Sequence, residues 1–575
     1  MPRLSRHLAP WFALFALLCL AGPGYTQAIL EGERFHPVPG TQGMVATSHP
    51  MATRVALDVL KAGGNAVDAA VTAGFALAVT QPRSGNIGGG GFMLVAPGDG
   101  GPVKAIDYRE TAPAAATRTM FQDSDGNVVA ERSRFSHLAS GVPGTVAGLA
   151  LALEQYGSIS LAEALKPAIA LARDGFDVPH RFTEGLQQAR DRLERWPATR
   201  AIFYGPDGEP PQPGERFRQP ELASTLQRIA DHGIRDFYEG ETARLIVAEM
   251  EQGGGLITAA DLAAYEPVIR EPVHGNYRGH DIYSMSPPSS GGAHIVQILN
   301  TLEGYPIGES GHNSAQTIHY MAEAMKRAYA DRAEYLGDTD FVEVPLEGIT
   351  SKGYAEKLRG EITGDQATPS DRIAAGKPQA YESDETTHFS IVDQWGNAVS
   401  NTYTINFSYG SGITVTGAGF LLNNEMDDFS AKPGVPNAYG LIGGEANRIQ
   451  PGKRMLSSMS PTIVQRDGRN VLVTGSPGGS RIITTTLQVI MNVIDHGMNV
   501  QSAVAAPRIH HQWLPDTLRI EQGISPDTID LLQAMGHDVE TQSAMGASQS
   551  VLVDQQGRLW GAADPRRSTS SAMGY

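Results

Sequence analysis

Two adjacent threonines, Thr386 and Thr387, are placed in this sequence where covalent chemistry would be possible. They open a strand-like run over residues 386–392, followed by a turn rich in Asp, Gly and Asn and a returning strand over 398–406. The preceding residues 364–385 show no periodicity, and long irregular stretches inside a domain tend to be functional or disordered. The pattern is typical of an ordinary hairpin behind a surface loop. It also fits a slack tether where the chain cuts itself and frees Thr386 as a new N-terminus.

A hydroxyl nucleophile needs a base, and the sequence has few alternatives to one supplied by the threonine itself. The single cysteine, Cys19, lies in the N-terminal apolar segment, and no Gly-x-Ser-x-Gly elbow is found. His510 and His511 are adjacent, so on a strand they would face opposite ways, and we expect no metal pair there. A free α-amine has an ordinary pKa of about 7.7–8.0, which suits a base at neutral pH. An N-terminal threonine therefore carries nucleophile and base in one residue.

Four segments downstream of the threonines carry groups that such a nucleophile needs. They are Thr404 with Asn406, the acidic run 421–429, the serine-rich run 456–461 and the glycine turn 475–481. The amides of a glycine turn can hold a developing anion. Each segment also has an ordinary interpretation as strand polarity, turn acids, a serine turn or a plain glycine turn.

The elements around these segments predict antiparallel sheets covered by helices. Small apolar residues over 66–79, opened by Asn65, predict a closely packed helix, and residues 144–360 are expected to be mainly helical. The clearest helix has Ser314 as its cap and ends near residue 337. Strand, Asp/Gly turn and strand recur in three hairpins, at 389–400, 462–475 and 550–561.

The N-terminus is that of an exported protein. Arg3 and Arg6 precede an apolar run over 8–21, which is typical of a signal peptide and short for a membrane span. Leu18 precedes Cys19 where a lipoprotein signal has a small residue, so no stable membrane anchor is expected. We expect residues 1–28 to be removed and the protein to be periplasmic or secreted, in a bacterium.

The chain is acidic, which argues against nucleic acid as a partner. Its formal charge is −17 over 575 residues, and no basic patch is evident. The glycine run at 88–91 is not followed by the Lys-Ser/Thr pair of a phosphate-binding loop. Glycines that let one backbone approach another are the better explanation of that run.

Taken together, the motifs resemble those of one family. The order Thr-Thr-His-x-Ser, Asn-Asn-Glu-Met-Asp-Asp-Phe, Leu-Ser-Ser-Met-Ser-Pro and Gly-Ser-Pro-Gly-Gly-Ser-Arg, at 386–390, 423–429, 456–461 and 475–481, resembles the γ-glutamyltransferases, also called glutathione hydrolases. Residues 63–70, the glycine run at 88–91 and Pro-Ser-Ser-Gly-Gly at 288–292 also look like this family. The resemblance extends from residue 43 to residue 575, nearly the whole mature chain.

The resemblance implies an N-terminal-nucleophile hydrolase with an α+β fold, a four-layer αββα sandwich. It implies a cut between Glu385 and Thr386 that gives a large subunit, 29–385, and a small subunit, 386–575, which together form one αββα domain. Thr386 would attack the γ-carbonyl of glutathione or another γ-glutamyl donor and form an acyl-enzyme. Water, an amino acid or a dipeptide would then take the acyl group, and no cofactor or metal is implied.

The resemblance also implies roles for individual residues. Thr404 would orient the nucleophile, and the amides of Gly478 and Gly479 would form the oxyanion hole. The remaining assignments are Arg109, Ser457 and Ser458 for the substrate α-carboxylate, Asn406, Glu425 and Asp428 for its α-ammonium, and Tyr439 as the aromatic of a lid loop. From the residues alone, Arg109 could equally be paired with Glu110 or another surface acid.

Three alternatives stay open. Two are relatives with another substrate, a glutaryl or cephalosporin acylase and a poly-γ-glutamate depolymerase. Arg109, Asp428 and the lid favour a free glutamyl head group, since a glutaryl group lacks the ammonium and a polymer needs an open groove. The third is an unprocessed periplasmic binding protein, against which Thr386, Thr404 and the glycine pair argue.

Overall fold

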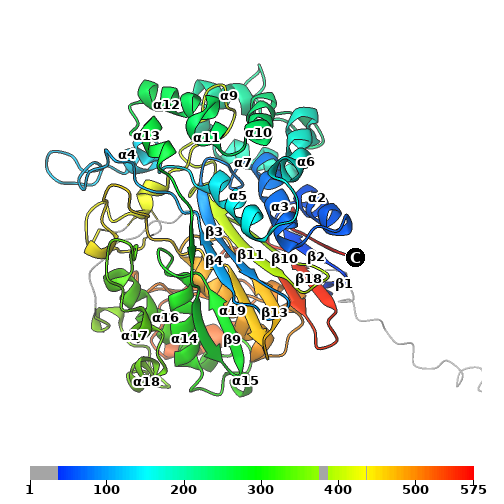
Figure 1. Cartoon of the computed structure of the whole chain (residues 1–575). Coiled ribbons are helices and arrows are strands. Elements are labelled where there is room, and N and C mark those ends of the chain that lie inside the picture. The colour runs from blue at the N-terminus through cyan, green and yellow to red at the C-terminus, as the bar shows by residue number, and fades with distance from the viewer. Residues whose placement is uncertain (1–35, 375–385, 436, 439) are drawn as a thin grey trace, which may run out of the picture.

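Two seven-stranded antiparallel sheets lie at the centre of the molecule (Figure 1). This computed structural model describes residues 36–374, 386–435, 437–438 and 440–575. The first sheet has the order β19 (Ser571–Gly574), β2 (Met44–Thr47), β10 (Thr387–Val392), β11 (Ala398–Thr404), β3 (Gly90–Ala96), β4 (Lys104–Asp107), β7 (Val268–Arg270). The second has the order β1 (Val38–Gly40), β18 (Leu559–Ala563), β17 (Gln549–Val553), β13 (Arg469–Thr474), β12 (Thr462–Arg466), β9 (His280–Ser284), β8 (Val273–Tyr277).

Helices cover the outer face of each sheet. Over the first sheet and its upper end lie α2 (Pro50–Lys61), α3 (Ala66–Thr80), α5 (Thr145–Tyr156), α6 (Leu161–Asp174), α7 (His180–Gln188), α8 (Arg190–Leu193), α9 (Pro197–Phe203), α10 (Pro220–His232), α11 (Arg235–Glu239), α12 (Glu241–Gly253) and α13 (Ala259–Ala263). The helices that pack on the second sheet include α14 (Gly291–Leu302), α19 (Arg481–Ile494) and α20 (Val500–Ala505), and α16 (Ala315–Tyr335) packs on α14. The predicted αββα sandwich is confirmed.

The remaining elements are short and peripheral. They are α4 (Ala130–Arg134), α15 (Ile307–Ser310), α17 (Leu346–Ile349), α18 (Lys352–Gly360), α21 (Pro526–Ala534), a three-stranded sheet of β14 (Ile509–His510), β15 (Leu518–Glu521) and β16 (Val539–Gln542), and the pair β5 (Phe176–Asp177) and β6 (Arg216–Phe217).

The strand β10 shows how both faces of a central strand become buried. Phe389 and Ile391 belong to the core under α3. Ser390 points the other way and donates its hydroxyl to the carbonyl of Gln549 on β17 at 2.9 Å. Because successive side chains of a strand face opposite sides, the sheet packs against helices on one side and against the second sheet on the other.

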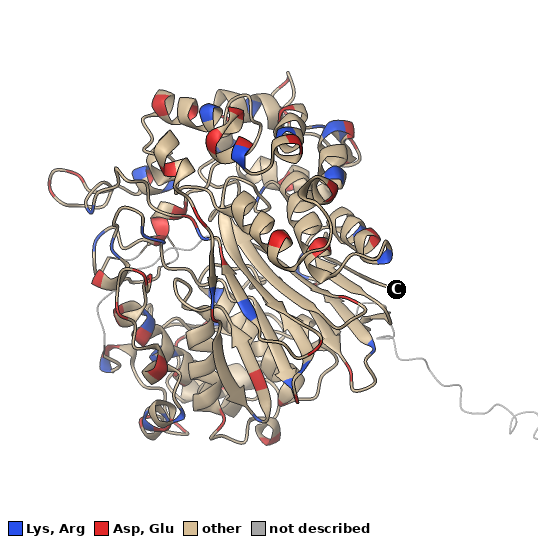
Figure 2. Cartoon of the chain, in the orientation of Figure 1, with Lys and Arg blue, Asp and Glu red and all other residues tan. Residues whose placement is uncertain are grey.

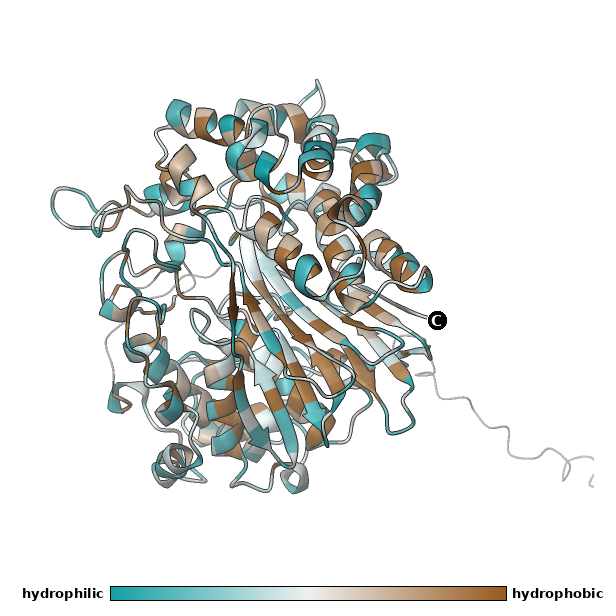
Figure 3. Ribbon diagram, viewed as in Figure 1, coloured by the Kyte–Doolittle hydropathy of each residue, from teal (hydrophilic) through white to brown (hydrophobic). Residues whose placement is uncertain are grey.

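Charge and hydropathy follow these layers. In Figure 2 the Lys, Arg, Asp and Glu residues gather on the outer helices and loops, and the strands carry few of them. Figure 3 shows apolar residues concentrated on the strands and on the helix faces that contact them. Among the described residues, none of the helices combines the length and apolar character that crossing a membrane requires.

Two helices begin as the sequence predicts. The Asn65 side chain accepts from the Val67 and Asp68 amides, and the Asp68 carboxylate accepts from the Asn65 amide, so α3 opens with a full capping box. Every residue of α3 is buried, which explains its small side chains. The Ser314 hydroxyl caps α16 by accepting from the Thr317 amide at 3.2 Å.

The expectation that residues 144–360 are mainly helical needs one correction. The segment contains β7, β8 and β9, and β8 and β9 form a hairpin on the edge of the second sheet. The exposed face of this hairpin carries His, Asn and Asp, such as His274 and Asp281, which conceals the apolar alternation that marks a strand.

The tether before Thr386 is also firmer at its start than the sequence indicates. The Ala367 amide donates to the Met535 carbonyl at 2.7 Å, and the Ser370 amide donates to Asp516 at 2.8 Å. The part over residues 375–385 lies outside the described residues. The returning strand ends at Thr404, two residues earlier than predicted, because Asn406 adopts a left-handed conformation with φ 71°.

Candidate active site

The end of the β10–β11 hairpin opens onto a buried pocket, which we call the threonine pocket. Thr386, only 4% exposed, and Thr404 contribute to its wall, and the space between its walls, part of it open to solvent, is about 320 Å³. Nine residues singled out from the sequence line it: Arg109, Thr386, Thr404, Asn406, Glu425, Asp428, Ser457, Ser458 and Gly479. These residues come from six separate segments of the chain, so only the folded sheets bring them together.

The two adjacent threonines have different surroundings. Thr386 lines the threonine pocket, whereas Thr387 is the first residue of β10 and shares a hydrogen bond of 2.6 Å with the Ser48 hydroxyl. Side chains of neighbouring residues in an extended chain point to opposite sides. The geometry therefore assigns Thr386, rather than Thr387, to the pocket.

Thr404 and Asn406 lie where β11 ends beside Thr386. The Thr404 hydroxyl accepts from the Asn406 amide at 2.8 Å, and the Asn406 side chain donates to the Asn424 carbonyl at 3.0 Å. This turn needs room for the glycine run beneath it, since a Cβ atom at Gly89 would lie 2.0 Å from the Thr404 carbonyl oxygen. The prediction that these glycines allow close backbone approach is confirmed.

A glycine turn borders the pocket just before α19. Gly478 and Gly479 have φ values of 135° and 53°, which side chains with a Cβ rarely adopt. Gly479 is followed by Ser480 with φ −58°, and such a left-handed to right-handed step makes a concave nest of amides that suits an anion. Gly479 lines the threonine pocket, and Gly478 adjoins it without being part of the wall.

A single buried guanidinium, that of Arg109, holds the acids of the pocket together. Arg109 is 1% exposed, and its Nη1 and Nη2 atoms lie 2.9 Å from Glu425 and 2.5 Å from Asp428. Glu110 lies farther away, at 3.7 Å from Nη1. Arg109 thus pairs with Glu110, but the pair is not on the surface, because Arg109, Glu110 and Glu425 are buried and Asp428 is only 13% exposed.

Burial and the charge of Arg109 shift the pKa values of the three acids in opposite directions. Burial raises the pKa of Glu425 well above its ordinary value and that of Glu110 to about 8, while Arg109 opposes both shifts. Burial also raises the pKa of Asp428, again against the effect of Arg109. Within the described part of the chain, neither oxygen of Glu425 nor Oδ1 of Asp428 accepts a hydrogen bond. The pocket therefore holds acceptors for a donor that is not part of its own wall.

The serine pair forms another part of the wall. The Ser457 hydroxyl accepts from the Met459 amide at 3.0 Å, and the Ser458 hydroxyl accepts from Arg332 Nη2 at 3.1 Å. Arg332 also donates from Nε to the Ser290 hydroxyl at 2.9 Å. Pairing between Ser289 and Ser457 ties this wall to the Pro-Ser-Ser-Gly-Gly motif.

Arg332 is the pocket residue that sequence reasoning missed. It lies on α16, three residues after Tyr329 and on the same buried face as Met325. Burial, more than any charge, lowers its pKa to about 10. The sequence signal for Arg332 is a charged residue on the apolar stripe of a helix. Charged side chains are rarely buried unless they are paired or functional.

Leu441, Met459 and Ile482 complete the wall with apolar side chains. Two predicted features cannot be located: Tyr439, the lid aromatic, and Glu385, the residue before the cut, lie outside the described residues.

The chain is similar to known proteins over nearly its whole length. Residues 52–574 match the sequence model of the family described as Gamma-glutamyltranspeptidase. A glutathione hydrolase proenzyme of Escherichia coli (strain K12) is 54% identical over 547 residues, which are 95% of this chain and 94% of that protein. Cephalosporin acylase from Bacillus halodurans has a TM-score of 0.84 at 29% identity, covering 96% of this chain and 98% of its own.

A solved chain of the gamma-glutamyltranspeptidase of Helicobacter pylori adds information on chain organisation. It has a TM-score of 0.56 at 46% identity and covers 57% of this chain but 94% of its own length. This coverage, and the proenzyme name of the Escherichia coli relative, fit two subunits made from one precursor. The threonine pocket, the sandwich fold and the match over residues 52–574 lead to one conclusion: the chain belongs to the gamma-glutamyltranspeptidase family.

Proposed function

We propose that this protein cuts itself before Thr386 and then cleaves the γ-glutamyl amide of glutathione and related donors, passing the acyl group to water, amino acids or dipeptides. One observation carries the proposal. The candidate nucleophile Thr386 shares a small buried pocket with one arginine and with acids that have hydrogen-bonding capacity to spare. That combination suits an acyl group whose head carries both a carboxylate and an ammonium.

The first reaction is the cut itself. The Thr386 hydroxyl oxygen attacks the carbonyl carbon of Glu385, and the C–N bond to Thr386 breaks as an ester forms. Water then hydrolyses the ester, which leaves a carboxylate on Glu385 and a free α-amine on Thr386. The products are a large subunit of residues 29–385 and a small subunit of residues 386–575, held together by the shared sheets.

The second reaction uses the new N-terminus. The neutral α-amine accepts the hydroxyl proton while the Thr386 oxygen attacks the γ-carbonyl carbon of the donor. The Gly478 and Gly479 amides stabilise the oxyanion, an effect worth about 3–4 kcal/mol per donor in measured cases. The donor's amine leaves with the proton, and Thr404 keeps the hydroxyl oriented. An acceptor then attacks the ester and regenerates the threonine.

When the substrate head group binds, its carboxylate and its ammonium become new partners of Arg109 and of the buried acids. The substrate carboxylate takes a place on the Arg109 guanidinium, with the Ser457 and Ser458 hydroxyls beside it. The substrate ammonium donates to Glu425 and Asp428, whose oxygens have unused acceptor capacity, and to Asn406. A zwitterion adds no net charge, so it enters a buried site at a lower desolvation cost than either ion alone.

A second candidate function is that of a glutaryl or cephalosporin acylase. The likeness to the Bacillus halodurans acylase favours it, since nearly the whole chain superposes. A glutaryl group has no ammonium, so the buried Glu425 and Asp428 would gain no donor from it.

The proposed site of action is the periplasm or the cell exterior, reached by a cleaved signal peptide over residues 1–28. Its partners are γ-glutamyl compounds such as glutathione, with amino acids or dipeptides as acceptors. We propose Tyr439 as the gating aromatic of a lid over the pocket. The reaction needs no metal or cofactor, because the threonine supplies both nucleophile and base.

The test compares acyl release from glutathione, a γ-glutamyl anilide and glutaryl-cephalosporin, with and without a dipeptide acceptor. The proposal expects rapid release from the first two donors, faster with acceptor, and little from the third. Release from glutaryl-cephalosporin at a rate equal to that from glutathione would instead support the acylase.

A further inference from the structure

The helix α16 contacts two different parts of the threonine pocket. Arg332 donates to Ser458 and Ser290, on the serine wall. Tyr329 lies three residues earlier, so it is one turn away on the same face of the helix. Its hydroxyl donates a hydrogen bond to the carbonyl oxygen of Ser480, the residue that follows the glycine turn. Tyr329 is 2% exposed, so this hydrogen bond is made inside the protein.

Ser480 is held by its side chain as well as by its carbonyl. It precedes α19, a position where a serine hydroxyl ordinarily accepts from the amides of the first helical turn. Within the described residues it makes no such cap, and it donates instead to Oε1 of Gln512 at 2.8 Å. The same oxygen accepts from Nε2 of His510 at 3.0 Å, and the His510 ring meets the Tyr329 ring edge to face, with 5.8 Å between centroids. Ser480 therefore has two hydrogen bonds that fix its position, in place of a helix cap.

The groups around Ser480 keep their protons at neutral pH in the form that these bonds require. Burial raises the pKa of Tyr329 above its ordinary value, so its hydroxyl remains a donor. Burial lowers the pKa of His510 well below its ordinary value, so the ring is neutral. Its proton lies on Nε2, because an amide oxygen such as Oε1 of Gln512 can only accept.

The first turn of α19 fixes the peptide planes of the glycine turn. The Arg481 amide donates to the Gly478 carbonyl at 2.9 Å, and the Ile482 amide donates to the Gly479 carbonyl at 3.3 Å. In a trans peptide the carbonyl and the following N–H point in opposite directions. The Gly478 carbonyl faces α19, so the Gly479 amide is directed away from the start of that helix. Because Gly479 lines the threonine pocket, the direction of this amide depends on where α19 begins.

We propose that Tyr329 is a positioning residue for the oxyanion: by holding the Ser480 carbonyl, it fixes the start of α19 and with it the direction of the Gly478 and Gly479 amides. The inference rests on the proposed function, which gives these two amides the oxyanion. Neither glycine has a Cβ to restrict its backbone, so contacts outside the turn must do so. Donors that are already oriented stabilise an oxyanion without reorganising during the reaction. Of the two neighbours on α16, Arg332 then supports head-group binding and Tyr329 supports the transition state.

The first experiment measures kcat and KM for γ-glutamyl release, counted per cut molecule. Tyr329→Phe removes one hydroxyl and keeps the ring, so we expect kcat to fall about tenfold, the effect of one hydrogen bond, with KM nearly unchanged. The matched control is Tyr204→Phe, which removes a hydroxyl that donates to the Leu186 carbonyl at 2.8 Å, outside the lining of the threonine pocket. This control should keep both constants. A wild-type kcat in Tyr329→Phe would overturn the proposal.

Two ligands separate the oxyanion from the head group. L-Glutamate carries the head group alone. In 2-amino-4-boronobutanoic acid a boronic acid replaces the γ-carboxyl: the Thr386 oxygen forms a bond to boron, its proton passes to the α-amine, and a tetrahedral anion results without a leaving group. We expect Tyr329→Phe to weaken boronate binding about tenfold and to leave glutamate binding unchanged, whereas Arg332→Lys should weaken both ligands alike. Equal weakening of both ligands by Tyr329→Phe would contradict a role at the oxyanion.

A second variant and melting curves keep the inference separate from folding. Ser480→Ala keeps the carbonyl but loses the hydroxyl that donates to Gln512, and it should lower kcat in the same way. A wild-type kcat in this variant would show that the position of Ser480 does not matter. Tyr329→Phe and Tyr204→Phe should lose similar amounts of stability, since each loses one buried hydrogen bond, so a fall in kcat confined to the first is no folding defect.

The wild-type protein separates this inference from the proposed function. If it neither releases a γ-glutamyl group nor binds the boronate, the proposed function fails. If it does both and Tyr329→Phe behaves like the wild type, only the role of Tyr329 fails.

Discussion

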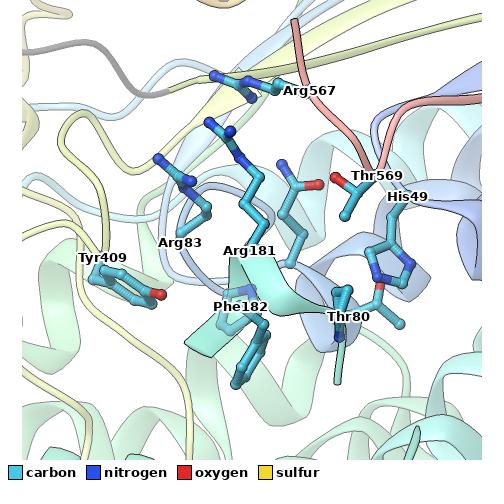
Figure 4. A pocket seen from close by; sticks show the side chains of 11 residues that line it. His49, Thr80, Arg83, Arg181, Phe182, Tyr409, Arg567 and Thr569 are labelled. Atoms are coloured by element: carbon cyan, nitrogen blue, oxygen red, sulfur yellow. The ribbon is translucent and has the colours of Figure 1, made fainter. Parts of the chain in front are cut away.

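Thr386 lies between two buried charge clusters of opposite composition. On its side-chain side, the threonine pocket has one central arginine surrounded by acids. On its carbonyl side lies a second pocket, the arginine pocket (Figure 4), whose described lining contains Arg83, Arg181 and Arg567 and no acid. In the threonine pocket the acids are the counter-ions of Arg109, so a ligand that is a zwitterion without net charge fits it. In the second pocket, burial and the charge of Arg567 both lower the pKa values of Arg83 and Arg181. The two sides of one threonine thus differ in the charged residues that surround them.

The largest effect should come from the threonine that separates the two pockets. Thr386→Ala should give a single uncut chain without γ-glutamyl release, because the nucleophile for both reactions is gone. Thr387→Ala is the matched control and should still be cut, since Thr387 contacts Ser48 rather than the pocket. A denaturing gel gives the answer, and two fragments from Thr386→Ala would contradict the assignment.

The next effect tests the central cation of the threonine pocket. Arg109→Ala removes the partner of the substrate carboxylate and should raise KM for glutathione about a hundredfold, corresponding to about 3 kcal/mol. Asp428→Asn, a milder change, should raise KM for γ-glutamyl donors and leave release of a glutaryl group unchanged. The exposed Arg118→Ala serves as control. An unchanged KM in Arg109→Ala would remove this residue from the carboxylate site.

A pH dependence distinguishes the acid-rich pocket from the rest of the fold. The Glu110 pKa is raised by burial from its ordinary value of 4.5 to about 8. Between these values the folded state holds one more proton than the unfolded state, so the unfolding free energy falls as pH rises from 4.5 through 8. Glu110→Gln should reduce this loss, whereas the exposed Glu251→Gln should not. Melting temperatures at pH 5.5 and 8.5, chosen as roughly the two sides of that window, measure it.

The smallest effect concerns Arg332, the arginine that supports the serine wall. Arg332→Lys keeps the charge but loses the planar guanidinium group, which donates hydrogen bonds to Ser458 and Ser290 at the same time. We expect KM to rise about fivefold, at the level of one hydrogen bond, with kcat nearly unchanged. A large fall in kcat at constant KM would place Arg332 in the reaction rather than in head-group binding.

The sequence predicts elements well where the signals are local. The cap of α3 by Asn65 and the hairpin turn at Asp393 depend on neighbouring residues, and the structure confirms both. The hairpin β8–β9 was missed because polar residues on its open face conceal the strand period. The end of β11 was misplaced because a single left-handed residue, Asn406, stops the strand.

The site is harder to predict because its residues come from distant segments. The resemblance to a family supplied nine of the residues that line the threonine pocket, and the motifs alone left each one ambiguous. Arg332 was missed because it lies in a helix whose other buried residues were assigned to the hydrophobic core. The arginine pocket was not predicted at all, since Arg83, Arg181 and Arg567 are isolated in sequence and only the fold brings them together.

The most direct test of the account is the mass of the small fragment during turnover. Wild-type protein is mixed with a γ-glutamyl anilide, quenched in acid, separated into fragments and weighed by mass spectrometry. The account predicts a fragment that begins at Thr386 and gains one γ-glutamyl group, located on that threonine by peptide mapping. An adduct on another residue, or a small fragment that begins elsewhere, would contradict it.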